Sequence, residues 1–396
     1  MSQKYRLILL IILLALLAGC GAPAEMGIDR HPGPANFDKA LDSVPVYDPQ
    51  PNDLWQMDLR SADLTKLDLS KSRDDLLYAS FDNKTVWPAP DKMPDDFDWQ
   101  KILETGKDPG LGIRELHRNE ITGKGVGVAI IDATLLVDHQ EYVNQIKLYE
   151  ETWEVRWLDS MSIHGAAVAS IAVGKTVGVA PEADLYYFAN ENCYGKGGTD
   201  FGCLSKIVRR VIEVNKQLPK EHKIRALSMS IGWMPGDKGY DEITSAIEEA
   251  KADGIFVVNA VLENTYGFQL FGMGRDPQAD PDNSHSYMPA DWWLNNFYAG
   301  AVPDSMLLVP MDSRTTASPT GFGDYVFYRQ GGTSWAIPYL AGTYALAVQV
   351  KPDITPEEFW AIALETGSTT QITHEGKEYS FGVILDPQAL IAALQK

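Results

Sequence analysis

The chain has 396 residues, of which 45% are hydrophobic, and its formal net charge at pH 7 is −20. This length suits one large α/β domain with an extension, or two ordinary domains, and the apolar content is enough for a sizeable core. The acidic balance lacks the basic surface that nucleic-acid binding needs. We therefore expect no nucleic-acid partner.

The first residues of the chain are predicted to be an export signal. Lys4 and Arg6 precede an apolar run, Leu7 to Leu17, which is too short to span a bilayer comfortably and is typical of a signal peptide. The run ends in Ala18-Gly19-Cys20, and this junction resembles the lipobox of bacterial lipoproteins. The resemblance implies that residues 1–19 are a signal peptide and that Cys20 is lipidated, which would anchor the protein at the extracytoplasmic face of the cell membrane. The alternative is an ordinary secretory signal with an incidental cysteine.

An N-terminal extension follows. Residues 20–37 are rich in Pro and Gly and are predicted to form a tether. Within residues 38–108, Asp-Leu pairs recur every five residues, at 53–54, 58–59, 63–64 and 68–69, and resemble pentapeptide repeats. Four repeats are too few to bury their leucines alone, so we expect them to pack on the main domain. A removable inhibitory propeptide is the alternative, although no sequence feature specifically supports it.

The main domain, residues 109–396, opens with a buried strand and a polar residue. Val126 to Ile131 is an apolar run of strand length that ends at Asp132. Such runs suit a central parallel strand, and open α/β sheets place their sites at the carboxyl ends of these strands. His164 begins a predicted helix of small residues, where a capping or core histidine is the simpler interpretation.

A serine stands in a glycine-rich turn late in the chain. Gly331-Gly332-Thr333-Ser334 precedes an apolar run, Tyr339 to Val350, which predicts a buried helix with Pro338 at its start. Ser334 would then lie just before a helix N-terminus, where free N–H groups and the helix dipole favour an anion. A serine-capped turn without chemical function is the alternative.

Two cysteines remain besides Cys20. Cys193 and Cys203 flank a glycine-rich loop, and an even pair in an exported chain favours a disulfide over free thiols. The loop has no His or further Cys at ligand spacing, so we expect no metal there. No aspartate spacing singles out a calcium loop, and no cofactor is predicted.

Five ordered motifs resemble the subtilisin-like serine proteases. They are Asp132 after its strand, His164-Gly165 with Val168-Ala169, Gly178-Val179-Ala180-Pro181, Ser230-Ile231-Gly232, and Gly332-Thr333-Ser334 with Ala336 and Pro338. The resemblance implies a three-layer αβα sandwich with a mainly parallel sheet, and a catalytic triad of Asp132, His164 and Ser334. That order of acid, base and nucleophile is the one the subtilisins use.

The resemblance also assigns chemical roles. His164 would take the Ser334 proton, and Asp132 would orient the imidazole and stabilise its charged form. Ser230, Ile231 and Gly232 would pair with an extended protein or peptide substrate.

The second oxyanion donor is the uncertain member of the predicted site. Counted from Gly254, the family's asparagine falls on Glu263, and Asn264 needs one inserted residue. A carboxylate would repel an oxyanion, so we predict Asn264, with Asn259 as the alternative.

The sequence thus predicts a lipid-anchored serine endopeptidase. The competing hypothesis is a lipoprotein that keeps the fold as a peptide-binding or scaffold module, with activity weakened by the altered oxyanion segment.

Overall fold

The computed structural model describes residues 26–48, 57–152, 162–190, 193–195, 198–300 and 306–396. Its centre is a five-stranded sheet of order β10-β9-β4-β6-β5, in which all neighbours are parallel. The strands are Phe256–Asn259 (β10), Ile224–Met229 (β9), Gly127–Asp132 (β4), Asp184–Ala189 (β6) and Ile146–Glu151 (β5). The predicted signal peptide, Cys20 and the first Asp-Leu pair lie outside the described residues.

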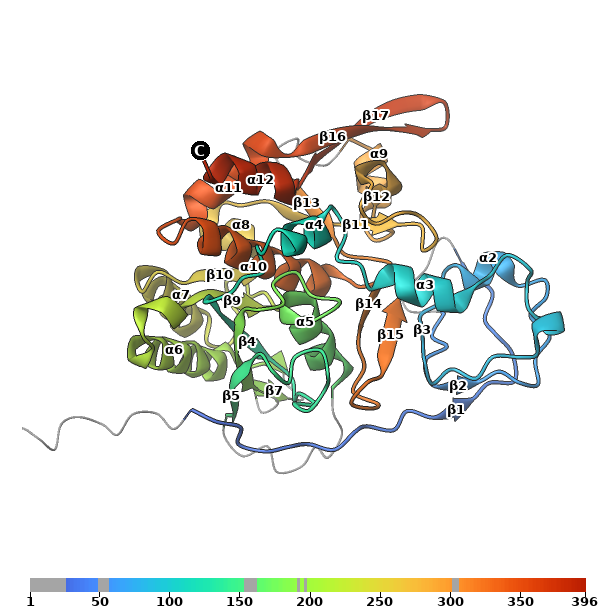
Figure 1. The fold of residues 1–396 in the computed structure, drawn as a ribbon, viewed down its shortest axis with the longest axis horizontal. Helices are drawn as coiled ribbons and strands as arrows, with labels where there is room; N and C mark the ends of the chain where they lie inside the picture. Colours follow the sequence, from blue (N-terminus) through green and yellow to red (C-terminus); the bar gives the residue numbers. More distant parts are fainter. Residues whose placement is uncertain (1–25, 49–56, 153–161, 191–192, 196–197, 301–305) are drawn as a thin grey trace, which may run out of the picture.

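Helices cover both faces of this sheet because its central strands are apolar on both sides. Val128 and Ile130 of β4 belong to a core shared with α5 (Ile163–Val173) and α10 (Thr333–Val350). The alternate residues Ala129 and Ile131 belong to a second core, shared with α6 (Phe201–Gln217) and α7 (Tyr240–Ala252). Since successive strand side chains point to opposite faces, the cores lie on opposite sides of the sheet (Figure 1). The predicted three-layer αβα sandwich with a parallel sheet is confirmed.

A second sheet, of order β12-β11-β13-β17-β16, lies on the C-terminal side of the domain. Its strands are Tyr287–Pro289 (β12), Leu270–Arg275 (β11), Leu307–Pro310 (β13), Lys377–Ile384 (β17) and Ser368–His374 (β16). The same part of the chain also holds four helices: α8 (Leu262–Tyr266), α9 (Leu294–Tyr298), α11 (Pro356–Thr366) and α12 (Pro387–Leu394). Thr355 caps α11 by accepting the N–H of Glu358 at 3.1 Å.

The extension is a short coil built from its five-residue repeats. Each described repeat turns in the same way, because its aspartate accepts a backbone N–H two residues later: Asp58 from Arg60 at 3.1 Å, Asp63 from Thr65 at 3.0 Å, and Asp68 from Ser70 at 3.1 Å. The leucines that follow these aspartates are buried, at 0%, 0% and 3% exposure. The repeat therefore alternates a turn-forming carboxylate outside with a core leucine inside.

This coil is joined to the main domain by a strand. β3 (Phe81–Asp82) pairs antiparallel with β15 (Tyr325–Tyr328), which pairs with β14 (Arg314–Ala317). Phe81 stands opposite Phe327, and both rings belong to a third core with the repeat leucines. Burying one such aromatic side chain contributes roughly 2–3 kcal/mol. The extension thus packs on the strand that leads into the Gly331–Ser334 turn (Figure 1).

Part of the predicted tether also contacts the main domain. The Asp29 N–H donates to the Tyr149 carbonyl at 3.0 Å, and the Arg30 guanidinium lies 2.7 Å from the Glu151 carboxylate. Further along, the Ala35 N–H donates to the Pro319 carbonyl at 2.9 Å.

The remaining elements are short. They are β1 (Lys39–Ala40), β2 (Ala62–Asp63), β7 (Tyr194–Gly195), β8 (Gly198–Thr199), α2 (Arg73–Leu76), α3 (Trp99–Gly106), α4 (Ile113–Arg118) and single turns at Pro90–Lys92, Lys220–His222 and Ser284–Ser286. Within the described ranges, no helix has both the length and the apolar character to cross a membrane.

Candidate active site

Asp132 and His164 meet at the carboxyl end of the central sheet. β4 ends at Asp132, and α5 begins at Ile163, directly after its cap Ser162, whose hydroxyl accepts the His164 N–H at 3.1 Å. The His164 Nδ1 atom lies 2.8 Å and 3.0 Å from the two Asp132 oxygens. Asp132 is 8% exposed and His164 is 35% exposed. The carboxylate is therefore held inside the protein while the imidazole reaches the surface.

The environment of His164 favours its protonated form. Burial alone would lower the pKa of His164, but the charge and hydrogen bond of Asp132 outweigh burial and raise that pKa. This contact fixes Nδ1 on the carboxylate side and leaves Nε2 free for another partner. The pair can thus accept a proton at Nε2 and stabilise the cation that forms.

Ser334 lies in the first turn of α10. The helix begins at Thr333, and Gly332 caps it with φ 71° and ψ 169°, a conformation that favours glycine. Gly332 offers no side-chain acceptor to the first N–H groups, and its carbonyl accepts only the Trp335 N–H, at 3.0 Å, so the Ser334 N–H has no partner in the cap. The half-buried serine consequently has backbone donors beside it.

The start of α10 corrects one sequence expectation. Pro338 is the sixth residue of the helix rather than its first, so its missing N–H leaves the Ser334 carbonyl without its helical donor. The Ser230 hydroxyl supplies that hydrogen bond instead, at 3.0 Å. The proline is tolerated because a side chain from β9's end replaces the lost bond, and this contact ties Ser230 to Ser334.

Trp335 brings the serine turn and the histidine together. Its ring packs edge-on against His164, with ring centroids 5.4 Å apart, and against Tyr328, with centroids 5.1 Å apart. Trp335 is only 5% exposed. Asp132, His164 and the Ser334 turn are therefore drawn from three elements into one region.

The predicted substrate-binding segment borders the same region. Ser230 and Ile231 line a cavity of about 250 Å³ with Asp132 and His164. The Ile231 carbonyl accepts the Ala260 N–H at 3.1 Å, so this residue's main chain faces inward. In an extended chain, neighbouring residues point their main-chain N–H and C=O groups in opposite directions. The groups of Ser230 and Gly232 therefore point away from β10, where an extended peptide could pair with them.

The two candidate oxyanion residues differ in their surroundings. Asn259 is 1% exposed, and its side chain is engaged with the Val261 N–H at 2.8 Å and the Thr265 hydroxyl at 3.0 Å. Asn264 is exposed on α8, and its amide donates only to the Met234 sulfur, at 3.6 Å. Both line a cavity of about 260 Å³ that Thr333 also borders. Asn259 thus shapes the turn after β10, whereas Asn264 keeps a donor that a substrate could engage.

Sequence reasoning missed Asp312. This carboxyl group is 2% exposed and accepts the Gly331 N–H at 2.8 Å, so it holds the turn that carries Ser334. Burial, opposed by Arg329 and the Gly331 N–H, raises the pKa of Asp312 to about 7. The signal that singled out Asp132, an aspartate shortly after an apolar strand, is also present here after Leu307 to Val309.

The cysteine pair joins the segment after β6 to the first turn of α6. The sulfur atoms of Cys193 and Cys203 lie 2.07 Å apart, as a disulfide. Among the residues that the structure describes, no group of three His, Cys, Asp or Glu side chains is placed to hold a metal ion.

The chain resembles known serine proteases. It is 27% identical over 292 residues to the serine protease AprX of Bacillus subtilis, which covers 62% of each chain. It is 26% identical over 263 residues to an intracellular serine protease of Paenibacillus polymyxa, covering 61% of this chain and 74% of the relative. The chain therefore spans less than two thirds of AprX.

A solved structure and a family model indicate the same kinship as these relatives. The fold resembles that of a protease from Pseudoalteromonas arctica, with a TM-score of 0.50 and 20% identity over 73% of this chain and 95% of that one. The model of the subtilase family matches residues 123–383, which hold Asp132, His164 and Ser334. The chain belongs to the subtilase family.

Proposed function

We propose that this protein is a serine endopeptidase that hydrolyses peptide bonds with Asp132, His164 and Ser334, anchored outside the cytoplasm through a lipid on Cys20. The observation that carries the proposal is the Asp132–His164 pair, joined at 2.8 Å and opening onto the cavity that Ser230 and Ile231 line. The serine turn reaches this pair through the Trp335 ring. Family membership and the serine protease relatives support the same activity.

The proposed reaction proceeds in two stages. Ser334 Oγ attacks the carbonyl carbon of the substrate while its proton passes to His164 Nε2, and Asp132 stabilises the imidazolium. The C–N bond then breaks as His164 returns this proton to the leaving nitrogen, which leaves an ester on Ser334. Water attacks the ester, His164 takes its proton and gives it back to Ser334 Oγ, and a carboxylic acid is released.

The oxyanion of each stage needs donors fixed in advance. The Ser334 N–H, in the uncapped first turn of α10, is one such donor. We propose the Asn264 amide as the other, since the Asn259 side chain is already engaged inside the protein. Each donor of this kind contributes about 3–4 kcal/mol to the transition state.

The activity is tested with a serine-reactive fluorophosphonate on the full chain. We expect labelling of the wild type and of Ser245→Ala, which alters an exposed serine of α7, but not of Ser334→Ala. If the folded wild type, checked by circular dichroism, remains unlabelled, the protein is instead the peptide-binding or scaffold module. The altered oxyanion segment, in which the family's asparagine falls on Glu263, is the observation that would favour that second function.

The anchor is tested separately in a bacterial host. Cells fed radiolabelled palmitate should incorporate it into the wild type but not into Cys20→Ser, and only the wild type should sediment with membranes. Equal labelling of both chains would refute the proposed lipidation site.

A further inference from the structure

A large cavity lies between the extension and the main domain. Its volume is about 540 Å³, within the range of roughly 300–1,000 Å³ that ligand sites occupy. Phe37, Lys39 and Arg60 line it from the extension, and Ile163 and Tyr328 line it from the main domain. Neither the extension nor the main domain forms this cavity alone.

The cavity adjoins the catalytic groups. Ser162 and Ile163, which line it, are the two residues directly before His164. Tyr328, another lining residue, packs edge-on against Trp335, the residue after Ser334. This cavity is separate from the cavity beside Asn264, whose lining residues all belong to the main domain.

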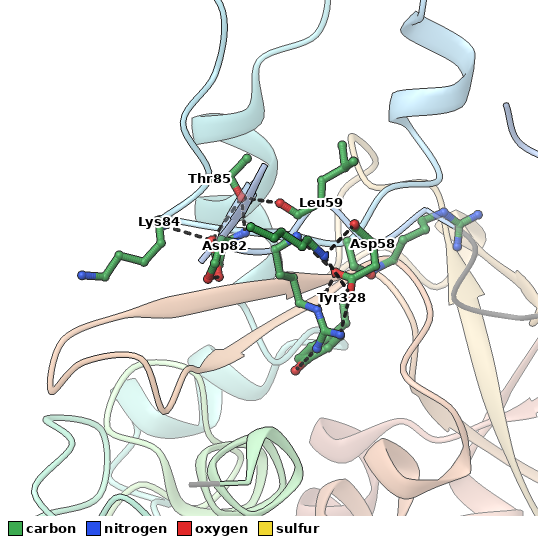
Figure 2. A network of polar contacts seen from close by, with 11 residues as sticks. Asp58, Leu59, Asp82, Lys84, Thr85 and Tyr328 are labelled. Atoms are coloured by element: carbon green, nitrogen blue, oxygen red, sulfur yellow. Dashed lines mark hydrogen bonds and ion pairs between the residues drawn. The ribbon is translucent and has the colours of Figure 1, made fainter. Parts of the chain in front are cut away.

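Both cations of the cavity wall are paired with one carboxylate, Asp58, and Asp38 is an exposed carboxylate on the same wall. The Arg60 Nε and one terminal nitrogen donate to the two Asp58 oxygens at 2.7 Å and 3.0 Å, and the other terminal nitrogen donates to the Tyr328 hydroxyl at 3.2 Å (Figure 2). The Lys39 ammonium lies 3.2 Å from Asp58 as well. Asp82 is buried, and its carboxylate accepts the N–H and the hydroxyl of Ser61.

An apolar occupant fits these surroundings best. Because the Lys39 and Arg60 cations are already paired with Asp58, an anionic ligand would have to break existing ion pairs to bind them. The remaining lining includes Phe37, Ile163 and Val326, whose apolar side chains gain by contact with another apolar side chain.

The chemistry of the proposed reaction indicates which side of the scissile bond would face this cavity. His164 must donate its proton to the leaving nitrogen, so the chain beyond the scissile bond departs past the imidazole. The cavity begins at the two residues before this imidazole. The acyl side of the substrate, in contrast, would lie along Ser230 and Gly232.

We propose that the extension stays with the enzyme and forms, with Ile163 and Tyr328, a subsite for a large apolar side chain among the first three residues on the leaving-group side of the scissile bond. This inference rests on the proposed endopeptidase activity. It gives the extension a role that a removable inhibitor would not have. The lining residues of the cavities beside His164 and Asn264 include no extension residue, so the extension leaves both open.

The test changes Phe37, which lines the cavity, is 39% exposed and belongs to none of the three hydrophobic cores. Internally quenched peptides would vary one residue at a time on each side of the scissile bond, with the full chain as enzyme. For wild type we expect large apolar residues to be preferred on the leaving-group side. Phe37→Asp should lower kcat/KM for these peptides about tenfold and favour basic residues there, and Phe37→Lys should favour acidic ones.

The matched control is Phe322→Asp, which adds the same charge at an aromatic residue that is 49% exposed and does not line the cavity. Acyl-side preferences should be the same in all four proteins. Hydrolysis with an unchanged leaving-group preference in both Phe37 variants would overturn the subsite alone. An active mature enzyme that mass spectrometry shows to lack residues 26–97 would overturn it too, whereas the absence of any hydrolysis would overturn the proposed activity with it.

Discussion

Replacing Asp312 by asparagine should change how stability depends on pH. Asp312 is almost fully buried, and its pKa is raised from 3.8 to about 7. A native carboxyl with a raised pKa binds more protons than the unfolded chain does between these two values, so its ionisation destabilises the native state as pH rises through that window. Each tenfold change in proton affinity corresponds to about 1.36 kcal/mol, so ionisation of Asp312 lowers the free energy of unfolding by up to about 4 kcal/mol.

Asparagine has nearly the same shape and can still accept the Gly331 N–H, but it does not titrate. The stability of Asp312→Asn relative to its parent should therefore rise between pH 4 and pH 7, by up to about 4 kcal/mol, and stay level above pH 7. The charges of Arg329 and Asp291 act on the pKa of this carboxyl in opposite directions and are unchanged in the variant.

The measurement is urea unfolding followed by tryptophan fluorescence at several pH values between 4.5 and 8. Both chains would carry Ser334→Ala, so that self-digestion does not distort the curves. A stability difference that is constant over this range, or that falls with pH, would refute the assignment of a raised pKa to Asp312.

Three further substitutions probe other contacts of the site. Asn264→Ala should lower kcat for a peptide library about 10²- to 10³-fold, far more than Asn259→Ala, and equal losses would mean that the oxyanion donor is misassigned. Ser230→Ala removes the donor to the Ser334 carbonyl and should cost about 1 kcal/mol in urea unfolding, so an unchanged midpoint would argue against that bond. Cys193→Ser should cost about 2–3 kcal/mol in thermal unfolding; if reductant still destabilised the variant as it does the wild type, the disulfide would not be the cause.

The sequence was most informative where local patterns and burial coincide. The apolar run before Asp132 predicts a central strand, and β4 is buried at every residue. The helix at His164 was predicted from its small residues, which let α5 pack closely against the core around α10. These features depend on neighbouring residues alone, so one chain is enough to find them.

The place of the extension could not be predicted in this way. The five-residue spacing identifies Leu59 and Leu64 as buried, but it does not say what covers them. Their cover includes Phe327, which lies far along the chain and pairs through β15 with Phe81. A pairing between such distant strands leaves no periodic signal in either segment, and the cavity that it creates beside Ile163 was equally invisible.

The start of α10 shows why a local rule can correctly predict that Pro338 is helical and still misplace the first residue of the helix. Proline is favoured at a first helical position because its missing N–H is then of no consequence, and that preference argued for a helix starting at Pro338. In the fold, Ser230 donates to the carbonyl that Pro338 leaves free, so the helix can begin five residues earlier, at Thr333. The consequence is chemical as well as structural. Ser334 moves from the approach to the helix into its first turn, where its own N–H joins the free donors that an oxyanion requires.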